Sequence, residues 1–101
     1  MRIARTGLSA GLALAALLTQ GLPATAACYA DYKAKQEPPL RLAYGVAELP
    51  DAGCTDLGAA AAVLAPRLAG AGWTLLSVIS LFGPEGLEER RESAADHFLR
   101  Y

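Results

Sequence analysis

Few residues of this chain have the types and spacing that chemistry requires. His97 is the only histidine among the 101 residues, and Asp96 precedes it directly. A general base needs a partner and a pocket, and a metal site needs several ligands. Neither is evident around His97, so the favoured interpretation is a structural histidine. A small enzyme with a cleft near His97 and Asp96 stays as the competing alternative.

The remaining candidates for catalysis are weaker. Ser77, Ser80 and Ser93 lack the glycine context of a nucleophile elbow. The acidic residues between 85 and 96 alternate with arginines, which is typical of a solvated loop of mixed charge. Gly83 to Gly86 is not followed by the Lys-Ser of a phosphate-binding loop. The sequence therefore predicts no enzyme, no cofactor and no metal site.

The N-terminus has the pattern of a secretory signal peptide. Arg2 and Arg5 precede a weakly apolar run from 8 to 18, and small residues follow up to Ala27. A helix of about eleven residues spans roughly 16 Å, about half of a hydrocarbon core of ~30 Å. We therefore expect cleavage after Ala26 or Ala27, no stable membrane span afterwards, and a periplasmic or secreted protein.

Both cysteines lie beyond the predicted cleavage site. In an exported chain, Cys28 and Cys54 are expected to form one disulfide, because their spacing does not fit a redox C-x-x-C motif. Closing a loop of about 27 residues is worth roughly 3–4 kcal/mol in the chain-entropy model. The alternative is a lipoprotein anchored through Cys28, which is less favoured because Thr25 stands where a Leu-like residue is usual.

Charge excludes two classes of partner. Without Arg2 and Arg5, seven basic residues remain against ten acidic ones, so the mature net charge is −3. A mildly acidic domain lacks the basic footprint of nucleic-acid binding and of attraction to anionic lipid.

Periodicity predicts an α+β domain over residues 40–101, preceded by the signal peptide at 1–27 and an N-terminal extension at 28–39. Residues 40–49 alternate as a strand with one buried face. A helix follows from Thr55 or Asp56 to about residue 71, bent at Pro66, and Gly72 and Trp73 fit a Schellman ending.

Two more strands complete the expected β-α-β-β order. Residues 73–82 carry apolar side chains on both faces, which favours a central strand, and residues 94–101 alternate as a last strand. One helix would pack on one face of this three-stranded sheet, and the disulfide would tie the extension to it.

The stretch LAGAGWTLLSVISLFG, together with HFLRY at the end, resembles a family of small domains of unknown function. In that family a helix ends in Gly-x-x-Gly-Trp-Glu-Leu and runs into a strand. Gly72, Trp73 and Leu75 match the pattern, while Thr74 replaces the acid. The mature chain also resembles small exported proteins of alphaproteobacteria that have no assigned activity. The resemblance implies export and a βαββ fold, and it implies no catalytic residues.

The two-faced strand raises the question of what covers its second side. The disulfide-tied extension, a second copy docked sheet to sheet, or another protein or small apolar ligand are the three alternatives. Leu76, Val78 and Phe82 are the predicted interaction face. The sequence thus favours an exported, non-catalytic binding module whose partner is unknown.

Overall fold

The computed structural model describes residues 28–101, so the predicted signal peptide lies outside the described residues. None of the helices in this range is long and apolar enough to cross a membrane. The elements are β1 (Cys28–Gln36), β2 (Arg41–Leu49), α2 (Leu57–Gly70), β3 (Thr74–Phe82) and α3 (Glu88–Ala94), with 3-10 turns at Asp51–Gly53, Pro84–Gly86 and Ala95–His97.

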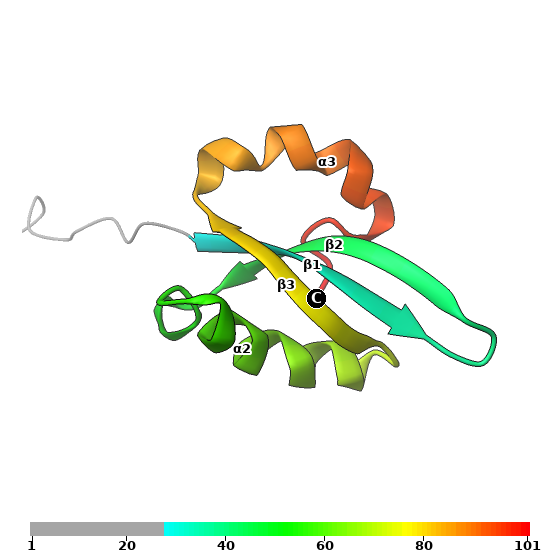
Figure 1. Ribbon diagram of the computed structural model, residues 1–101. Coiled ribbons are helices and arrows are strands. Elements are labelled where there is room, and N and C mark those ends of the chain that lie inside the picture. The colour runs from blue at the N-terminus through cyan, green and yellow to red at the C-terminus, as the bar shows by residue number, and fades with distance from the viewer. Residues whose placement is uncertain (1–27) are drawn as a thin grey trace, which may run out of the picture.

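The three strands form one antiparallel sheet in the order β2-β1-β3, which confirms the α+β class and the three-stranded sheet (Figure 1). The order of the elements differs from the predicted β-α-β-β. Residues 28–39, expected as an extension, contain the central strand β1, and the strands and α-helices run β-β-α-β-α. Asp31, Lys33 and Lys35 alternate with small or aromatic residues there, and their charges hid a strand that is buried mainly on one face.

The predicted last strand is wrong. Residues 94–97 finish α3 and form a 3-10 turn, and the tail then crosses the outer edge of β2. A single parallel bridge joins Val46 to Phe98, and the Leu99 amide donates to the Val46 carbonyl at 2.8 Å. Ala95 and Leu99 have φ of 50° and 56°, and this left-handed backbone cannot continue an extended strand.

β3 is an edge strand, not the predicted central one. Its pairing with β1 shifts twice, between Asp31 and Tyr32 and between Lys33 and Ala34. Each shift inserts one extra residue into β3, Ile79 and Leu76 respectively, so each is a β-bulge that changes which face the following side chains occupy. The apolar residues on both apparent faces therefore reflect bulges and not burial on two sides.

Local signals set the ends of α2. The Asp56 carboxylate accepts from the Ala59 amide at 2.7 Å, as expected of an N-cap. Pro66 lies inside one continuous helix. At the other end Gly72 has φ of 86° and the Trp73 amide donates to the Leu68 carbonyl at 2.9 Å, which confirms the Schellman ending.

The main core lies between α2 and one face of the sheet. It is made of small residues from the strands and larger ones from α2, namely Ala30, Tyr32, Ala34, Ala47, Leu49, Ala60, Leu64, Leu68 and Trp73. The Tyr32 ring lies over Gly45, where any Cβ would collide with it. The predicted disulfide between Cys28 and Cys54 closes this layer, with Cα atoms 6.1 Å apart.

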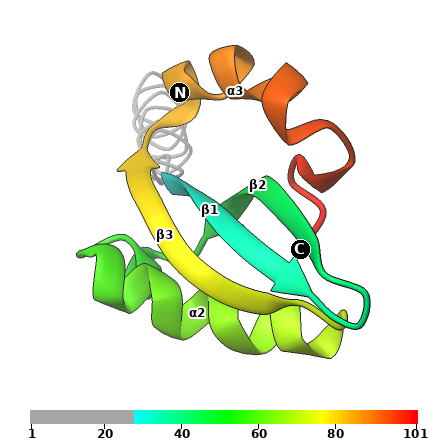
Figure 2. The ribbon, with the colours of Figure 1, turned by 45° about the vertical axis from the view of Figure 1, so that its right-hand side comes forward.

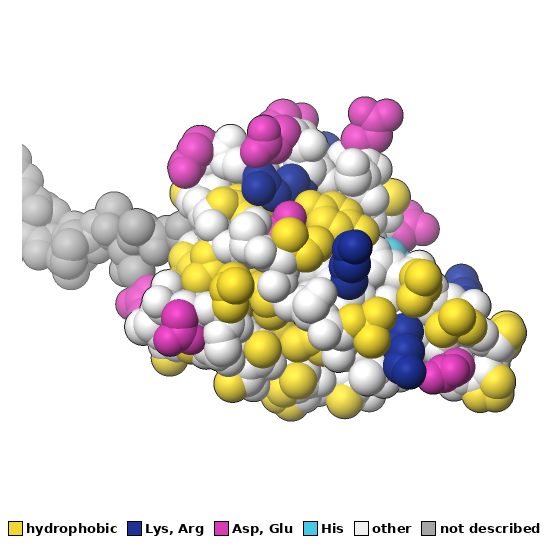
Figure 3. Space-filling view, viewed as in Figure 1, with side chains coloured by type: hydrophobic (Ala, Val, Ile, Leu, Met, Phe, Trp, Pro, Cys, Tyr) yellow, Lys and Arg dark blue, Asp and Glu magenta, His cyan; other side chains and the backbone are white. Residues whose placement is uncertain are grey.

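The α3 helix packs on the opposite face of the sheet, so the molecule has three layers at one end (Figures 1 and 2). Val46 and Ala94 are buried on this side, outside the main core. We call this part the covered end: residues 29–31, 46–48 and 80–82. The part toward the β1–β2 hairpin, residues 33–36, 41–44 and 74–77, is the open end. Around the sheet, hydrophobic and basic side chains share the surface, whereas acidic ones gather mainly over α3 (Figure 3).

Candidate functional site

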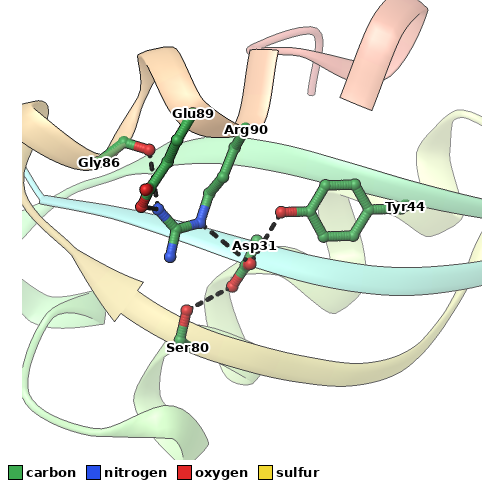
Figure 4. A network of polar contacts seen from close by, with 6 residues as sticks. All are labelled: Asp31, Tyr44, Ser80, Gly86, Glu89 and Arg90. Carbon is green, nitrogen blue, oxygen red and sulfur yellow. Dashed lines mark hydrogen bonds and ion pairs between the residues drawn. The ribbon is translucent and has the colours of Figure 1, made fainter. Parts of the chain in front are cut away.

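A buried polar cluster centred at the covered end joins all three strands to α3, with Tyr44 reaching it from the open end (Figure 4). Its centre is Asp31, which is 5% exposed. One carboxylate oxygen accepts from the Ser80 hydroxyl at 2.6 Å, and the other accepts from the Tyr44 hydroxyl at 2.8 Å and from Arg90 Nε at 3.2 Å. Alternation along β1 turns Asp31 away from the main core, and β2, β3 and α3 each supply one donor.

Arg90 holds α3 in place through several further contacts. Its Nη1 donates to the Gly86 carbonyl at 2.8 Å and to Glu89 at 2.7 Å. The guanidinium lies 3.9 Å from the centre of the Phe82 ring, which itself stacks on Tyr29. A charge on α3 is thus matched by a charge and an aromatic face on the sheet.

Electrostatics keep this cluster in one protonation state. Burial alone would raise the pKa of Asp31, but hydrogen bonds from Ser80, Tyr44 and Arg90 outweigh it and hold that pKa below its ordinary value. Burial, and then the bond to Asp31, raise the pKa of Tyr44 to about 12. Asp31 is therefore ionised at neutral pH, with both oxygens engaged. The cluster suits an internal clamp better than acid–base catalysis, which needs a group that can reach a substrate.

A shallow hollow of about 260 Å³ lies beside the cluster, at the open end. Its lining is mostly apolar and consists of Lys33, Ala34, Leu42, Ala43, Tyr44 and Leu76. Tyr44 belongs to both features: because Asp31 engages its hydroxyl, the wall that it gives the hollow is largely apolar.

Two leucines that line the hollow are unusually exposed: the exposed fractions of Leu42 and Leu76 are 71% and 50%. Leu40, in the turn just before β2, is 62% exposed but does not line the hollow. Lys33 is exposed and makes no ion pair with any other residue of this range. Clustered leucines with a free cation are what a binding surface presents, whereas scattered ones need no explanation.

The structure separates the three residues of the predicted interaction face. Leu76 lines the hollow, as expected of an exposed binding residue. Val78 pairs with Tyr32 and packs against the α2-side core, because the bulge at Ile79 turns it over. Phe82 lies under Arg90 at the covered end. Only Leu76 of the three therefore belongs to the open surface.

His97 and Asp96 do not come together as a catalytic pair. The His97 ring meets Trp73 edge-on at 5.1 Å and tilts over Tyr101 at 6.0 Å, so it closes the side of the α2 layer. Asp96 is exposed, and no hydrogen bond joins it to His97 within residues 28–101. No group of acidic, cysteine or histidine side chains in that range could hold a metal ion.

One buried hydroxyl lacks a partner. Tyr32 is 1% exposed, and its hydroxyl makes no hydrogen bond within the described part of the chain. Burial, and then the neighbouring Tyr101, raise the pKa of Tyr32 to about 12. The Tyr32 ring packs over Gly45, and this packing holds the hydroxyl in its buried position.

Sequence reasoning missed the Asp31 cluster because its members are far apart in the chain. The arginine follows the aspartate by 59 positions, in a segment interpreted as a solvated loop. The alternation of Ala30, Tyr32 and Ala34 was the available signal, since it places Asp31 on the other face of a strand.

Comparison with protein-family models, with curated proteins and with solved structures found no match to this chain. The resemblance to a family with a Gly-Trp-x-Leu motif stays a prediction, and the function has to be argued from the geometry.

Proposed function

We propose that this protein is an exported, disulfide-stapled binding module without catalytic activity, and that the open end of its sheet is the binding surface. The observation that carries the proposal is a contrast between the covered end and the open end on the face of the sheet against which α3 packs. At the covered end, Asp31 is satisfied by Ser80, Tyr44 and Arg90, whereas at the open end the exposed Leu42, Leu76 and Lys33 line a mostly apolar hollow.

Export is supported by the signal-peptide pattern together with the cysteine pair. The Cys28 sulfur is bonded to Cys54 and therefore cannot also carry the thioether of a lipoprotein anchor. Expression of the full chain in a Gram-negative host, followed by intact mass measurement without reductant, tests this. The expected product begins at Ala27 or Cys28 and lacks the two thiol hydrogens; a diacylglyceryl adduct on Cys28 would refute it.

The binding surface can be tested with an apolar anionic probe. Fluorescence titration with 1-anilinonaphthalene-8-sulfonate at low protein concentration should show binding that Leu42→Ser and Leu76→Ser each weaken several-fold. Leu57→Ser is the matched control, because Leu57 is a leucine of 46% exposure on α2, away from the hollow. Equal probe binding by all three variants and the wild type would place the binding surface elsewhere.

A further inference from the structure

We propose that a second hollow, at the outer edge of β2, binds a small carboxylate that has an apolar body. This site shares no residue with the open end, so the inference goes beyond the proposed function. The tail that follows α3 reaches this edge of the sheet (Figure 2). The hollow has a volume of about 420 Å³, which is within the range of small-molecule sites. We call it the edge hollow, and it is lined by Glu48, Leu49, Pro50, Arg67, Leu99 and Tyr101.

Arg67 supplies the positive charge of the edge hollow. Its Nη1 donates to the Glu48 carbonyl at 2.8 Å, which fixes the guanidinium at the edge of β2. Its Nε and Nη2 make no hydrogen bond within residues 28–101, and Arg67 makes no ion pair in that range. A guanidinium that is already held in place and keeps free donors is suited to bind a carboxylate.

The backbone of β2 adds a second donor. The Glu48 carbonyl points away from β1, as does the Val46 carbonyl, which accepts from the Leu99 amide. The N–H and C=O of one strand residue point to the same side, so the Glu48 amide also points outward. No residue in 28–101 accepts a hydrogen bond from it. The Glu48 amide and the Arg67 guanidinium can therefore share the two oxygens of one carboxylate.

The carboxylate of Glu48 does not neutralise Arg67. Side chains alternate along β2, so Leu49 packs in the core on the α2 side while the Glu48 side chain turns to the opposite face. No ion pair joins Glu48 to Arg67. A second arginine lies beside the hollow, because the Arg100 guanidinium is 5.7 Å from the centre of the Tyr101 ring. Positive charge thus prevails at this edge, which favours an anionic ligand.

The walls of the edge hollow favour a ligand with an apolar body. Leu49, Pro50 and Tyr101 contribute to them, together with Leu99, which is 42% exposed. Leu99 has φ of 56°, a left-handed backbone that costs a bulky residue free energy and that glycine adopts without strain. A leucine that is both strained and exposed gains little stability from its position, and strain of this kind is found at binding sites.

NMR titration of isotopically labelled protein, expressed from the full chain with its disulfide intact, tests the site with phenylacetate. Phenylacetate should bind saturably and shift the amide signals of Glu48 and Leu49 most. Phenylacetamide has the same body without the charge, and acetate has the charge without the body. Both should bind at least tenfold more weakly, because each loses one of the two kinds of contact.

Substitutions separate the two parts of the site. Arg67→Gln should weaken phenylacetate binding at least tenfold, because it removes the charged donor. Leu99→Gly should weaken it several-fold, because it removes an apolar wall without straining the backbone. Arg41→Gln, at the other end of β2, is the matched control and should leave binding unchanged. Circular dichroism should show that all three variants are folded.

Three outcomes would overturn the edge hollow. The first is phenylacetate shifts at Lys33, Leu42 and Tyr44 in place of Glu48 and Leu49, which would put anion binding at the open end. The second is equal binding of phenylacetamide and phenylacetate, and the third is binding that Arg67→Gln does not change. A protein that shows no saturable shift with phenylacetate also refutes the site, and it leaves the binding surface at the open end to its own test.

Discussion

The covered end and the open end of the sheet consist of the same three strands, but they differ in the contacts that their side chains make. At the covered end, the disulfide, the Asp31 cluster and the Phe82–Arg90 stack all fasten the chain. At the open end, the same strands carry the exposed Leu42 and Leu76, together with Lys33, which makes no ion pair with any other residue in 28–101. α2 backs the whole sheet, so the difference comes from α3. The domain therefore concentrates its stabilising contacts in one region and leaves the other free to bind.

The disulfide should have the largest effect on stability, because it fastens the first residue of β1 to the turn before α2. Replacing both cysteines (Cys28→Ser with Cys54→Ser) should lower the free energy of unfolding by roughly 3–4 kcal/mol. Urea denaturation of the double variant beside the oxidised wild type measures it. A loss below about 1 kcal/mol would mean that the covered end does not depend on this bond.

Removing the Arg90 side chain should have the second-largest effect on stability. Arg90→Ala leaves the buried Asp31 carboxylate with two of its three donors, which should cost roughly 2–3 kcal/mol. The value lies below that of a fully buried pair because the Arg90 side chain is 21% exposed. Lys33→Ala, at the open end, is the control and should change the free energy of unfolding by less than about 0.5 kcal/mol. Equal losses of unfolding free energy in Arg90→Ala and Lys33→Ala would show that the covered end does not contribute more to stability than the open end.

Acid should weaken the covered end in particular. The pKa of Asp31 is lower in the folded protein than its ordinary value of 3.8, so its contribution to stability is present above about pH 4 and is lost as the pH falls through the folded pKa. The difference in unfolding free energy between the wild type and Asp31→Asn should thus be larger at pH 7 than at pH 3. A difference that does not depend on pH would contradict this assignment.

The smallest expected effects concern two tyrosines. The Tyr44 hydroxyl has a hydrogen-bond partner, whereas the Tyr32 hydroxyl has none within residues 28–101. Tyr44→Phe should destabilise the protein by about 1.5 kcal/mol, because its hydroxyl donates to a carboxylate. Tyr32→Phe should be neutral or slightly stabilising, because it removes a buried hydroxyl without a partner. Thermal and urea unfolding of both variants measures the pair, and the opposite order would show that the Tyr32 hydroxyl is satisfied in solution.

Sequence signals that act over a few residues predicted the structure well. The helix cap at Thr55 or Asp56, the helix ending at Gly72 and Trp73, and the strand at 40–49 were predicted from neighbouring residues. The structure has the cap at Asp56, the same helix ending and a strand at Arg41–Leu49. Features that depend on residues far apart in the sequence were predicted wrongly. Lys33 and Lys35 concealed the central strand, and the alternation of residues 94–101 resembled a strand that Ala95 and Leu99 prevent.

The candidate site divides in the same way. The disulfide could be predicted, because two cysteines allow only one pairing. Of the predicted interaction face, only Leu76 lies on the open surface, because the bulges of β3 depend on its register with β1. The Asp31–Arg90 pair joins residues whose proximity only the folded topology creates.

The position of β1 at both the beginning of the described chain and the middle of the sheet has a consequence for assembly. A chain that emerges N-terminus first releases its central strand before either neighbour. The β1–β2 hairpin can close as soon as Leu49 is available, but the other edge of β1 must wait for Thr74–Phe82. During that interval β1 offers unpaired amides and carbonyls to any other extended chain, so the nascent protein is most prone to mispairing before its last strand arrives.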